Sequence, residues 1–186
     1  MGMNAGNVQM VPENRVYHCM ATSREFLILF GGYICTSDAD GNELWCYNTL
    51  NGDWKLHIPP KDIQVNSLSA SICVLGNFVY IFGGSCLNDI SRWTNSLASF
   101  DIIKNTWKIL SQHNDDHDEN TPTPMCGNLL LHQNGSLYVL GVNPNYVELY
   151  QMFKFCLKTS TWSSVSQNGE IPSFSRKIWG TVYKNQ

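Results

Sequence analysis

The sequence predicts an all-β fold, a propeller in which four-stranded sheets stack side by side around an axis. Short apolar runs end in glycine three times: residues 26–30 before Gly31 and Gly32, 78–82 before Gly83 and Gly84, and 137–140 before Gly141. An aromatic residue also precedes a tryptophan by seven positions three times, as Tyr47 and Trp54, Phe100 and Trp107, and Phe155 and Trp162. The tryptophans are 53 and 55 residues apart. A fixed period of about 50 residues with several short strands in each unit is typical of propeller blades.

Each position of this repeated motif has a physical reason. Glycine after an apolar strand allows a turn with positive φ and lets two backbones approach closely. The aromatic residue and the tryptophan are large, flat side chains that bury much apolar area. We therefore interpret the three tryptophans as core between blades rather than as a binding site.

The repeated pattern resembles the kelch repeat over residues 14–186. The first unit, through residues 43–48 and 52–54, is similar in particular to the group of kelch domain-containing protein ten, and the run at 134–139 fits that group too. The third unit departs from the pattern, because Val142 stands in the place of the second glycine. The resemblance implies a kelch β-propeller that binds proteins. For this group it implies the substrate-recognition part of a cullin–RING ubiquitin ligase.

The chain is expected to be a partial propeller of three blades and the first strand of a fourth. Residues 1–13 are predicted to be a flexible leader, the blades to occupy 14–59, 66–112 and 124–167, and the fourth to start at 171–186. The innermost strand of each blade comes first, at 17–21, 69–75 and 127–132. A tight turn such as Asn134-Gly135 then leads into the second strand. Variable loops at 33–42, 85–95 and 142–148 are where recognition residues are expected.

An unfinished ring would leave sheet faces and edges exposed. We interpret the chain as a fragment of a longer propeller, with self-association of half-rings as the alternative. In either case the isolated chain is expected to be a poor soluble monomer.

Composition excludes several classes of function. Charged residues are 15% of the chain and the formal net charge is −3, which argues against binding to nucleic acid. No apolar run reaches the length of a membrane span, and the first residues lack the features of a secretory signal. The seven cysteines are scattered singly without a C-x-x-C pair, which favours reduced thiols in the cytoplasm or nucleus. No catalytic motif and no zinc spacing is present, so we expect no enzyme activity, no metal and no cofactor.

Three residues are candidates for ligand binding. Arg15 and His18 stand at the start of the first innermost strand, and Arg176 stands near the equivalent start in blade four. In kelch proteins of this kind, arginines at that position often face the ligand across the rim of the channel, and a guanidinium can grip a carboxylate with two hydrogen bonds. The alternative is that Arg15 bonds only to carbonyl groups of its own loop.

Two acidic segments are interpreted as structural. Residues 113–119 look like a metal cluster but are expected to form a solvated insertion between blades two and three. Residues 38–43 are expected to form a turn rather than a calcium loop.

Three functional hypotheses remain open. The first is a substrate receptor that holds the C-terminal tails of client proteins and that docks on elongin and cullin, if the full-length chain has a box for them. The second is a kelch scaffold or a signalling regulator without a ligase. The third, and most remote, is a propeller enzyme.

Overall fold

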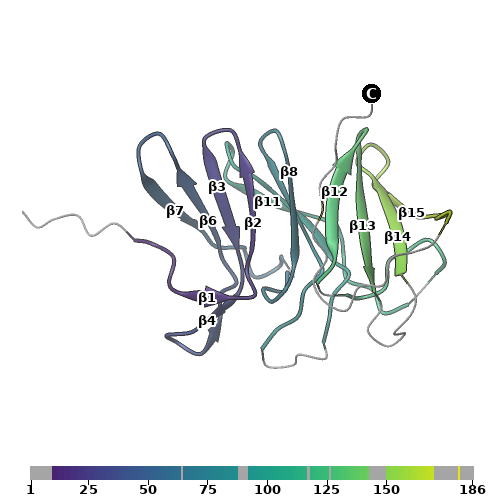
Figure 1. The fold of residues 1–186 in the computed structure, drawn as a ribbon, viewed down its shortest axis with the longest axis horizontal. Helices are drawn as coiled ribbons and strands as arrows, with labels where there is room; N and C mark the ends of the chain where they lie inside the picture. The colour runs from purple at the N-terminus through teal and green to yellow at the C-terminus, as the bar shows by residue number, and fades with distance from the viewer. Residues whose placement is uncertain are drawn as a thin grey trace, which may run out of the picture.

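The computed structural model describes residues 10–63, 65–87, 92–116, 118–125, 127–142, 150–169 and 180. These residues form strands and turns without a helix, arranged as three four-stranded antiparallel sheets and one three-stranded sheet (Figure 1). The prediction of an all-β, partial propeller is therefore confirmed. The four-stranded sheets stand side by side as blades 1, 2 and 3, in chain order.

The strands follow the simple up-and-down order expected of a blade, from the innermost to the outermost. Blade 1 consists of β2 (Cys19–Ser23), β3 (Phe26–Phe30), β6 (Leu44–Asn48) and β7 (Asp53–His57). Blade 2 consists of β8 (Ser71–Leu75), β9 (Phe78–Phe82), β10 (Leu97–Asp101) and β11 (Thr106–Ser111). Blade 3 consists of β12 (Leu129–Gln133), β13 (Ser136–Val142), β14 (Tyr150–Cys156) and β15 (Thr161–Val165). The small sheet consists of β1 (Arg15–Val16), β4 (Tyr33–Ile34) and β5 (Ala39–Asp40).

The innermost strands begin two residues later than the sequence predicts. They start at Cys19, Ser71 and Leu129, because the residues two positions earlier leave the extended conformation. Tyr17, Ser69 and Gly127 have φ values of 60°, 54° and 65°. Their main chains link the blades: Ser69 N–H donates to the Tyr17 carbonyl, and Gly127 N–H donates to the Ser69 carbonyl, both at 2.9 Å.

The aromatic–tryptophan pairs occupy equivalent places in the three blades. Tyr47 lies opposite Trp54, Phe100 opposite Trp107, and Phe155 opposite Trp162 on the two outer strands. The ring centroids within these pairs are 5.0, 4.8 and 4.9 Å apart. The tryptophans are half-buried rather than fully buried, since they sit on the outermost strand of each blade.

Two of the tryptophans also join neighbouring blades. The Trp107 ring lies 6.5 Å from that of Phe30 in blade 1, and the Trp162 ring lies 5.6 Å from that of Phe82 in blade 2. Each contact belongs to a buried apolar cluster between two blades. The core is therefore divided into layers between sheets, as propeller geometry requires.

The glycine pairs permit a close approach of the next blade. Gly31 has φ +73°, and a Cβ there would overlap the Ser67 carbonyl; Gly83 has φ +72°, and a Cβ there would lie 2.6 Å from the Met125 carbonyl oxygen. In blade 3 the single Gly141 lies inside β13, which continues through Val142. The departure noted in the sequence thus corresponds to a longer second strand.

Two predicted segments lie largely outside the described residues. They are most of the leader at 1–13 and the start of a fourth blade at 171–186, of which Gly180 alone is described. A Cβ on Gly180 would meet the Leu129 side chain at 2.8 Å, so Gly180 lies against the innermost strand of blade 3.

Candidate functional site

The connections between strands divide the molecule into two faces. We call "loop face" the one built from the long connections at 31–43, 58–63, 65–70, 83–87, 92–96, 112–116 and 118–125, which lies at the bottom of Figure 1. The opposite, "turn face" is built from the tight hairpin turns at 23–26, 48–53, 75–78, 101–106, 133–136 and 156–161. Long connections on a rigid scaffold are the usual place for recognition, so the loop face is the first candidate.

Arg15 occupies the loop face but points into the protein. Its side chain is 2% exposed, and Nη2 lies 2.7 Å from Glu43 Oε1. Its other nitrogens donate to the carbonyls of Gly31, at 3.2 Å, and Glu13, at 3.0 Å. The same Glu43 oxygen accepts a hydrogen bond from the Trp45 indole at 2.7 Å. Arg15 therefore joins β1, the loop after β3 and the start of β6, and ligand binding by its guanidinium stays a prediction.

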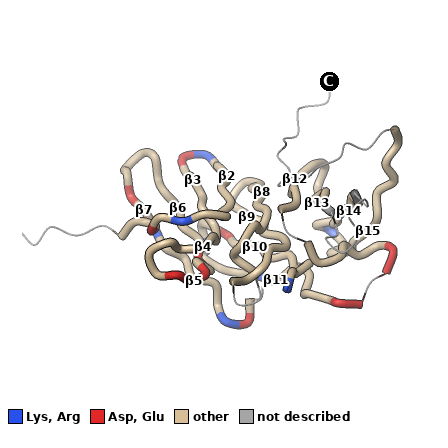
Figure 2. Tube along the Cα trace, turned by 60° about the horizontal axis from the view of Figure 1, so that its bottom comes forward, with Lys and Arg blue, Asp and Glu red and all other residues tan. Residues whose placement is uncertain are grey.

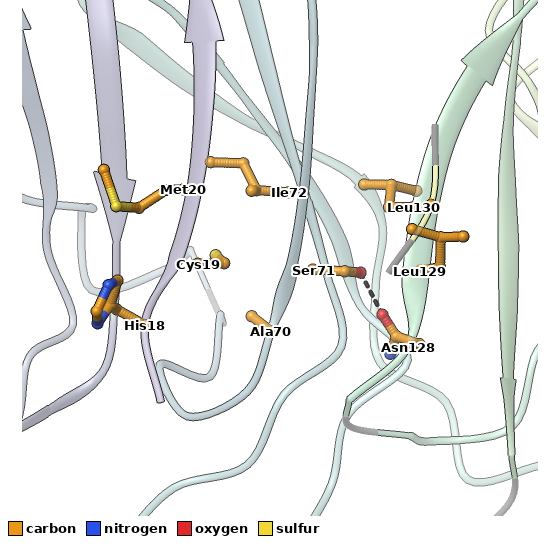
Figure 3. Close-up of a pocket in the computed structure, with 10 residues that line it drawn as sticks. His18, Cys19, Met20, Ala70, Ser71, Ile72, Asn128, Leu129 and Leu130 are labelled. Carbon is orange, nitrogen blue, oxygen red and sulfur yellow. Dashed lines mark hydrogen bonds between the residues drawn. The ribbon is translucent and has the colours of Figure 1, made fainter. Parts of the chain in front are cut away.

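His18 lies next to a cavity of about 300 Å³ in the channel between the innermost strands of the three blades (Figure 3). Met20, Ile72 and Leu130 give this cavity an apolar lining. Ser71 and Asn128 add a polar edge, where the Ser71 hydroxyl donates to the Asn128 side-chain carbonyl. The structure thus separates His18, at the cavity, from Arg15, which is held in the small sheet. Arg176 lies outside the described residues.

Acidic side chains outnumber basic ones on the described loop face. Figure 2, in which this face comes forward, shows acidic residues on several of its loops. The acidic residues of its connections are Asp38, Asp40, Glu43, Asp62, Asp115, Asp116, Asp118 and Glu119, and the basic ones are Lys61 and Arg92; Glu13 and Arg15, in and before β1, add one of each sign. Because Arg15 is paired with Glu43, the potential of this face favours basic groups of a partner over acidic ones.

The segment at 113–119 is anchored at its start, which the sequence did not predict. Asn95 is 2% exposed, and its amide donates to the carbonyls of Asn114 and Pro122, each at 2.8 Å. Its side-chain oxygen accepts a hydrogen bond from Asn114 N–H at 2.9 Å. Residues 114–116, 118 and 119 are exposed, as predicted for a solvated insertion, but a buried amide ties the start of the segment to the residues before β10.

Asp40 connects two of the predicted recognition loops. Its two carboxylate oxygens accept from Leu87 N–H at 3.1 and 2.9 Å. Within the first loop, the Tyr33 hydroxyl donates to Asp38 at 2.8 Å. The hydrogen bond to Asp38 raises the pKa of the Tyr33 hydroxyl. The loops of blades 1 and 2 thus present one connected surface.

Cys156 is a residue that the sequence analysis missed. It begins the outer turn of blade 3, in the position held by Asn48 in blade 1 and Asp101 in blade 2, whose side-chain oxygens accept turn N–H groups. Hydrogen bonds from the Thr159 side chain and from the N–H groups of Thr159 and Lys158 lower the pKa of the Cys156 thiol, and Lys154 adds to this effect. An alignment of the three repeats could have found it, because only there does a thiol replace an oxygen acceptor.

We expect Cys156 to react fastest with iodoacetamide at pH 7. Its lowered pKa raises the thiolate fraction, and the thiolate is the nucleophile. Burial raises the pKa of Cys46 and Cys73 to about 11, so these should label last. Mass spectrometry after timed labelling of the folded protein measures the rates. Thr159→Val should shift the labelling of Cys156 to higher pH; equal rates at Cys156 and Cys73 would contradict the assignment.

Within the described ranges, no group of three or more His, Cys, Asp or Glu side chains is arranged to hold a metal ion. The same ranges contain no helix with the length and apolar character needed to cross a membrane.

Three blades that share an aromatic–tryptophan pair, two of them with a glycine pair at the end of the second strand, define a propeller of the kelch class. The chain belongs to the kelch-repeat family: residues 5–186 match the KLHDC2/KLHL20/DRC7 Kelch-repeats domain. It is 33% identical to mouse kelch domain-containing protein 1, over 61% of this chain and 28% of that protein. It is 25% identical to human kelch domain-containing protein 10, over 84% of this chain and 36% of that protein.

A fungal relative is also matched over only part of its length. Tip elongation aberrant protein 3 of Schizosaccharomyces pombe is 25% identical over 84% of this chain and 16% of that protein. The chain therefore spans about two fifths or less of the relatives' own length. As a member of this family it is a protein-interaction propeller.

Proposed function

We propose that the chain is the client-recognition propeller of a cullin–RING ubiquitin ligase and that it binds the C-terminal tails of proteins. The observation that carries the proposal is the cavity of about 300 Å³ in the channel, with its apolar walls and its polar edge at Ser71 and Asn128. A pocket with an apolar lining and a few fixed polar groups suits the last side chains of a peptide. The ligase connection, with elongin and cullin as partners, is what the resemblance to the group of kelch domain-containing protein 10 would imply.

The structure indicates that groups other than the Arg15 guanidinium would hold a terminal carboxylate. Arg15 is occupied by Glu43 and by two carbonyls, and the polar side chains that line the cavity are His18, Ser71 and Asn128. A terminal carboxylate can also be captured by N–H groups without a guanidinium, as backbone nests do. The acidic loops would then select tails with basic side chains before the terminus.

A degenerate library of C-terminal hexapeptides, prepared as free acids and as amides, tests the proposal on the folded chain. Binding of the free acids, loss of binding on amidation, and weaker binding by His18→Ala with normal binding by Arg24→Ala are expected. Co-purification of the full-length protein with elongin and cullin tests the ligase connection separately. Amides that bind as well as the acids would end the proposal of tail recognition.

The acidic loop face favours a second candidate, a scaffold or signalling regulator that binds internal basic segments of a partner. In the same library, selection of basic peptides irrespective of amidation would support it. We also propose that the chain has no enzyme activity; its kelch-repeat family and the lack of a catalytic motif in the sequence support this proposal.

A further inference from the structure

A histidine, His57, is buried at the boundary between blades 1 and 2. It is the last residue of β7, the outermost strand of blade 1, and is 5% exposed. Its imidazole lies 4.7 Å from the Phe100 ring of blade 2, and Nδ1 lies 2.5 Å from Oδ1 of Asn105, in the turn between β10 and β11. At the next boundary the equivalent residue is Leu110, which packs against the buried cluster there. At this position a titratable side chain is therefore present at the first boundary and absent from the second.

The contact with Asn105 defines which nitrogen would gain a second proton. Because Asn105 Oδ1 is an acceptor, Nδ1 carries the proton of the neutral imidazole and donates it. Nε2 is then the nitrogen that is protonated in acid. The hydrogen bond to Asn105 exists in both charge states, so protonation of His57 creates no new contact with blade 2.

The surroundings of His57 favour the neutral imidazole. Burial lowers the pKa of His57, and the positive charge of Lys55, two residues away on β7, acts in the same direction. The hydrogen bond to Asn105 has the opposite effect on this pKa and is weaker than burial. A charged imidazolium at this boundary would therefore be costly, as for any buried charge without a counter-charge.

Charged groups on the neighbouring elements supply no counter-charge. On β7, Asp53 is four residues from His57, about 13 Å along a strand. On β6, the uncharged Leu44 lies opposite His57, and burial raises the pKa of the Cys46 thiol to about 11. In blade 2, Lys104 precedes the turn residue that accepts from His57 and has the same sign as an imidazolium. Among the described residues, no salt bridge includes His57.

The boundary is held differently at its inner and outer edges. At the inner edge the main chains are joined, since Ser69 N–H donates to the Tyr17 carbonyl at 2.9 Å. At the outer edge a cavity of about 520 Å³ adjoins His57. The outer edge of the next boundary has a further contact, because the Trp162 indole donates to the Ser111 hydroxyl at 3.0 Å. The outer edge between blades 1 and 2 can therefore open while the inner edge acts as a hinge.

We propose that protonation of His57 opens the outer edge of the boundary between blades 1 and 2 in mildly acidic surroundings. The sign follows from linkage, because an imidazole that is neutral in the closed boundary binds its proton more readily once the boundary is open. This contribution to stability is fully present above the ordinary pKa of 6.5 and is lost as the pH falls below it, through the lowered pKa of the buried group. Opening gives solvent access to Cys46, which is 3% exposed in the closed boundary. The proposal does not depend on tail recognition at the channel.

Thiol labelling of the folded 186-residue chain tests the proposal. The reagent is 4,4′-dithiodipyridine, which still reacts in acid, and mass spectrometry measures the rate at each cysteine. His57→Gln removes the titration and keeps a hydrogen-bond donor for Asn105. The rate at Cys46 in the wild type, divided by that in His57→Gln, should rise between about threefold and tenfold from about pH 7.5 to about pH 5.5, values on either side of the ordinary imidazole pKa. The same quotient for Cys73, which packs at the second boundary, should stay constant. Burial also lowers the pKa of His132, whose titration is common to both proteins and cancels in the quotient.

His57→Leu, which copies Leu110, is the second variant and should behave as His57→Gln does. Circular dichroism at neutral pH checks that each variant is folded. An equal pH dependence of Cys46 labelling in the wild type and in a folded variant would overturn the proposal. A quotient for Cys73 that rises as much as that for Cys46 would also overturn it, because the whole chain would then be unfolding. The wild type alone gives a further check: burial raises the pKa of both thiols to about 11, so a ratio of Cys46 to Cys73 rates that does not rise in acid would contradict opening at the first boundary.

Discussion

Replacing Arg15 with alanine is expected to lower the free energy of unfolding by about 2–4 kcal/mol, because a buried ion pair loses one partner. The guanidinium makes three contacts, with Glu13, Gly31 and Glu43. Its removal leaves the Glu43 carboxylate without its positive partner, and only the hydrogen bond from the Trp45 indole remains. We place the value below the largest losses of this kind, since the Glu43 side chain keeps 20% exposure and some contact with water. Urea unfolding followed by tryptophan fluorescence measures the change.

Arg24 is the control for this prediction. It lies in the turn between β2 and β3, is exposed, and should cost less than about 0.5 kcal/mol when replaced by alanine. The double replacement Arg15→Met with Glu43→Leu should recover part of the loss, since neither charge is then left alone. A loss from Arg15→Ala no larger than that from Arg24→Ala would show that the buried pair contributes nothing to stability.

The Arg15 result bears on how far sequence alone could define a site. The sequence predicted that Arg15 and His18 lie together at the start of an innermost strand. It could not predict in which direction their side chains point. Direction depends on Glu43, which lies 28 residues further along the chain and meets Arg15 only after β3 and β6 have paired. A change of peptide affinity in Arg15→Ala would therefore have to be separated from a loss of structure in blade 1.

The fold was far more predictable than the site, and the reason is repetition. The seven-residue spacing of aromatic and tryptophan fixes two strands joined by a tight turn, so Tyr47 must lie opposite Trp54 once the hairpin forms. The glycine pairs mark the ends of β3 and β9 for a similarly local reason: their φ values are positive. The aromatic–tryptophan pair is repeated in all three blades and the glycine pair in blades 1 and 2, and neither depends on distant partners.

The features that the sequence analysis did not predict arise at positions where one repeat differs from the others. At the boundary between blades 1 and 2, the buried polar side chain of His57 stands where the next boundary has the apolar Leu110. In the outer turn of blade 3, the thiol of Cys156, whose pKa is lowered by hydrogen bonds from Thr159 and Lys158, stands where the other two blades have oxygen acceptors. Neither difference affects a residue of the kelch motif. The effect of each is recognised only when equivalent positions of the blades are compared in the structure.

Trp107→Ala is expected to have the largest effect on stability, about 3–5 kcal/mol, as for other truncations of large core aromatics. The indole packs on Phe100 in its own blade at 4.8 Å and on Phe30 of blade 1 at 6.5 Å. Removing it opens space in the layer between blades 1 and 2, which also contains the fully buried Ile28 and Ile81. Those neighbours are fixed by their strands and cannot close the cavity, so the loss includes both transfer and cavity contributions.

Trp54 offers a test of the inter-blade part of this effect within the same protein. It has the same position in blade 1, but its described ring contacts, with Tyr47 at 5.0 Å and Trp45 at 6.3 Å, are within its own blade. We therefore expect Trp54→Ala to cost about half as much as Trp107→Ala, or less. Denaturant unfolding of the two variants, followed by circular dichroism so that the lost fluorophores do not bias the comparison, measures the difference. Equal losses would mean that the tryptophan stabilises its own hairpin, and that the stacking of Trp107 on Phe30 does not hold the blades together.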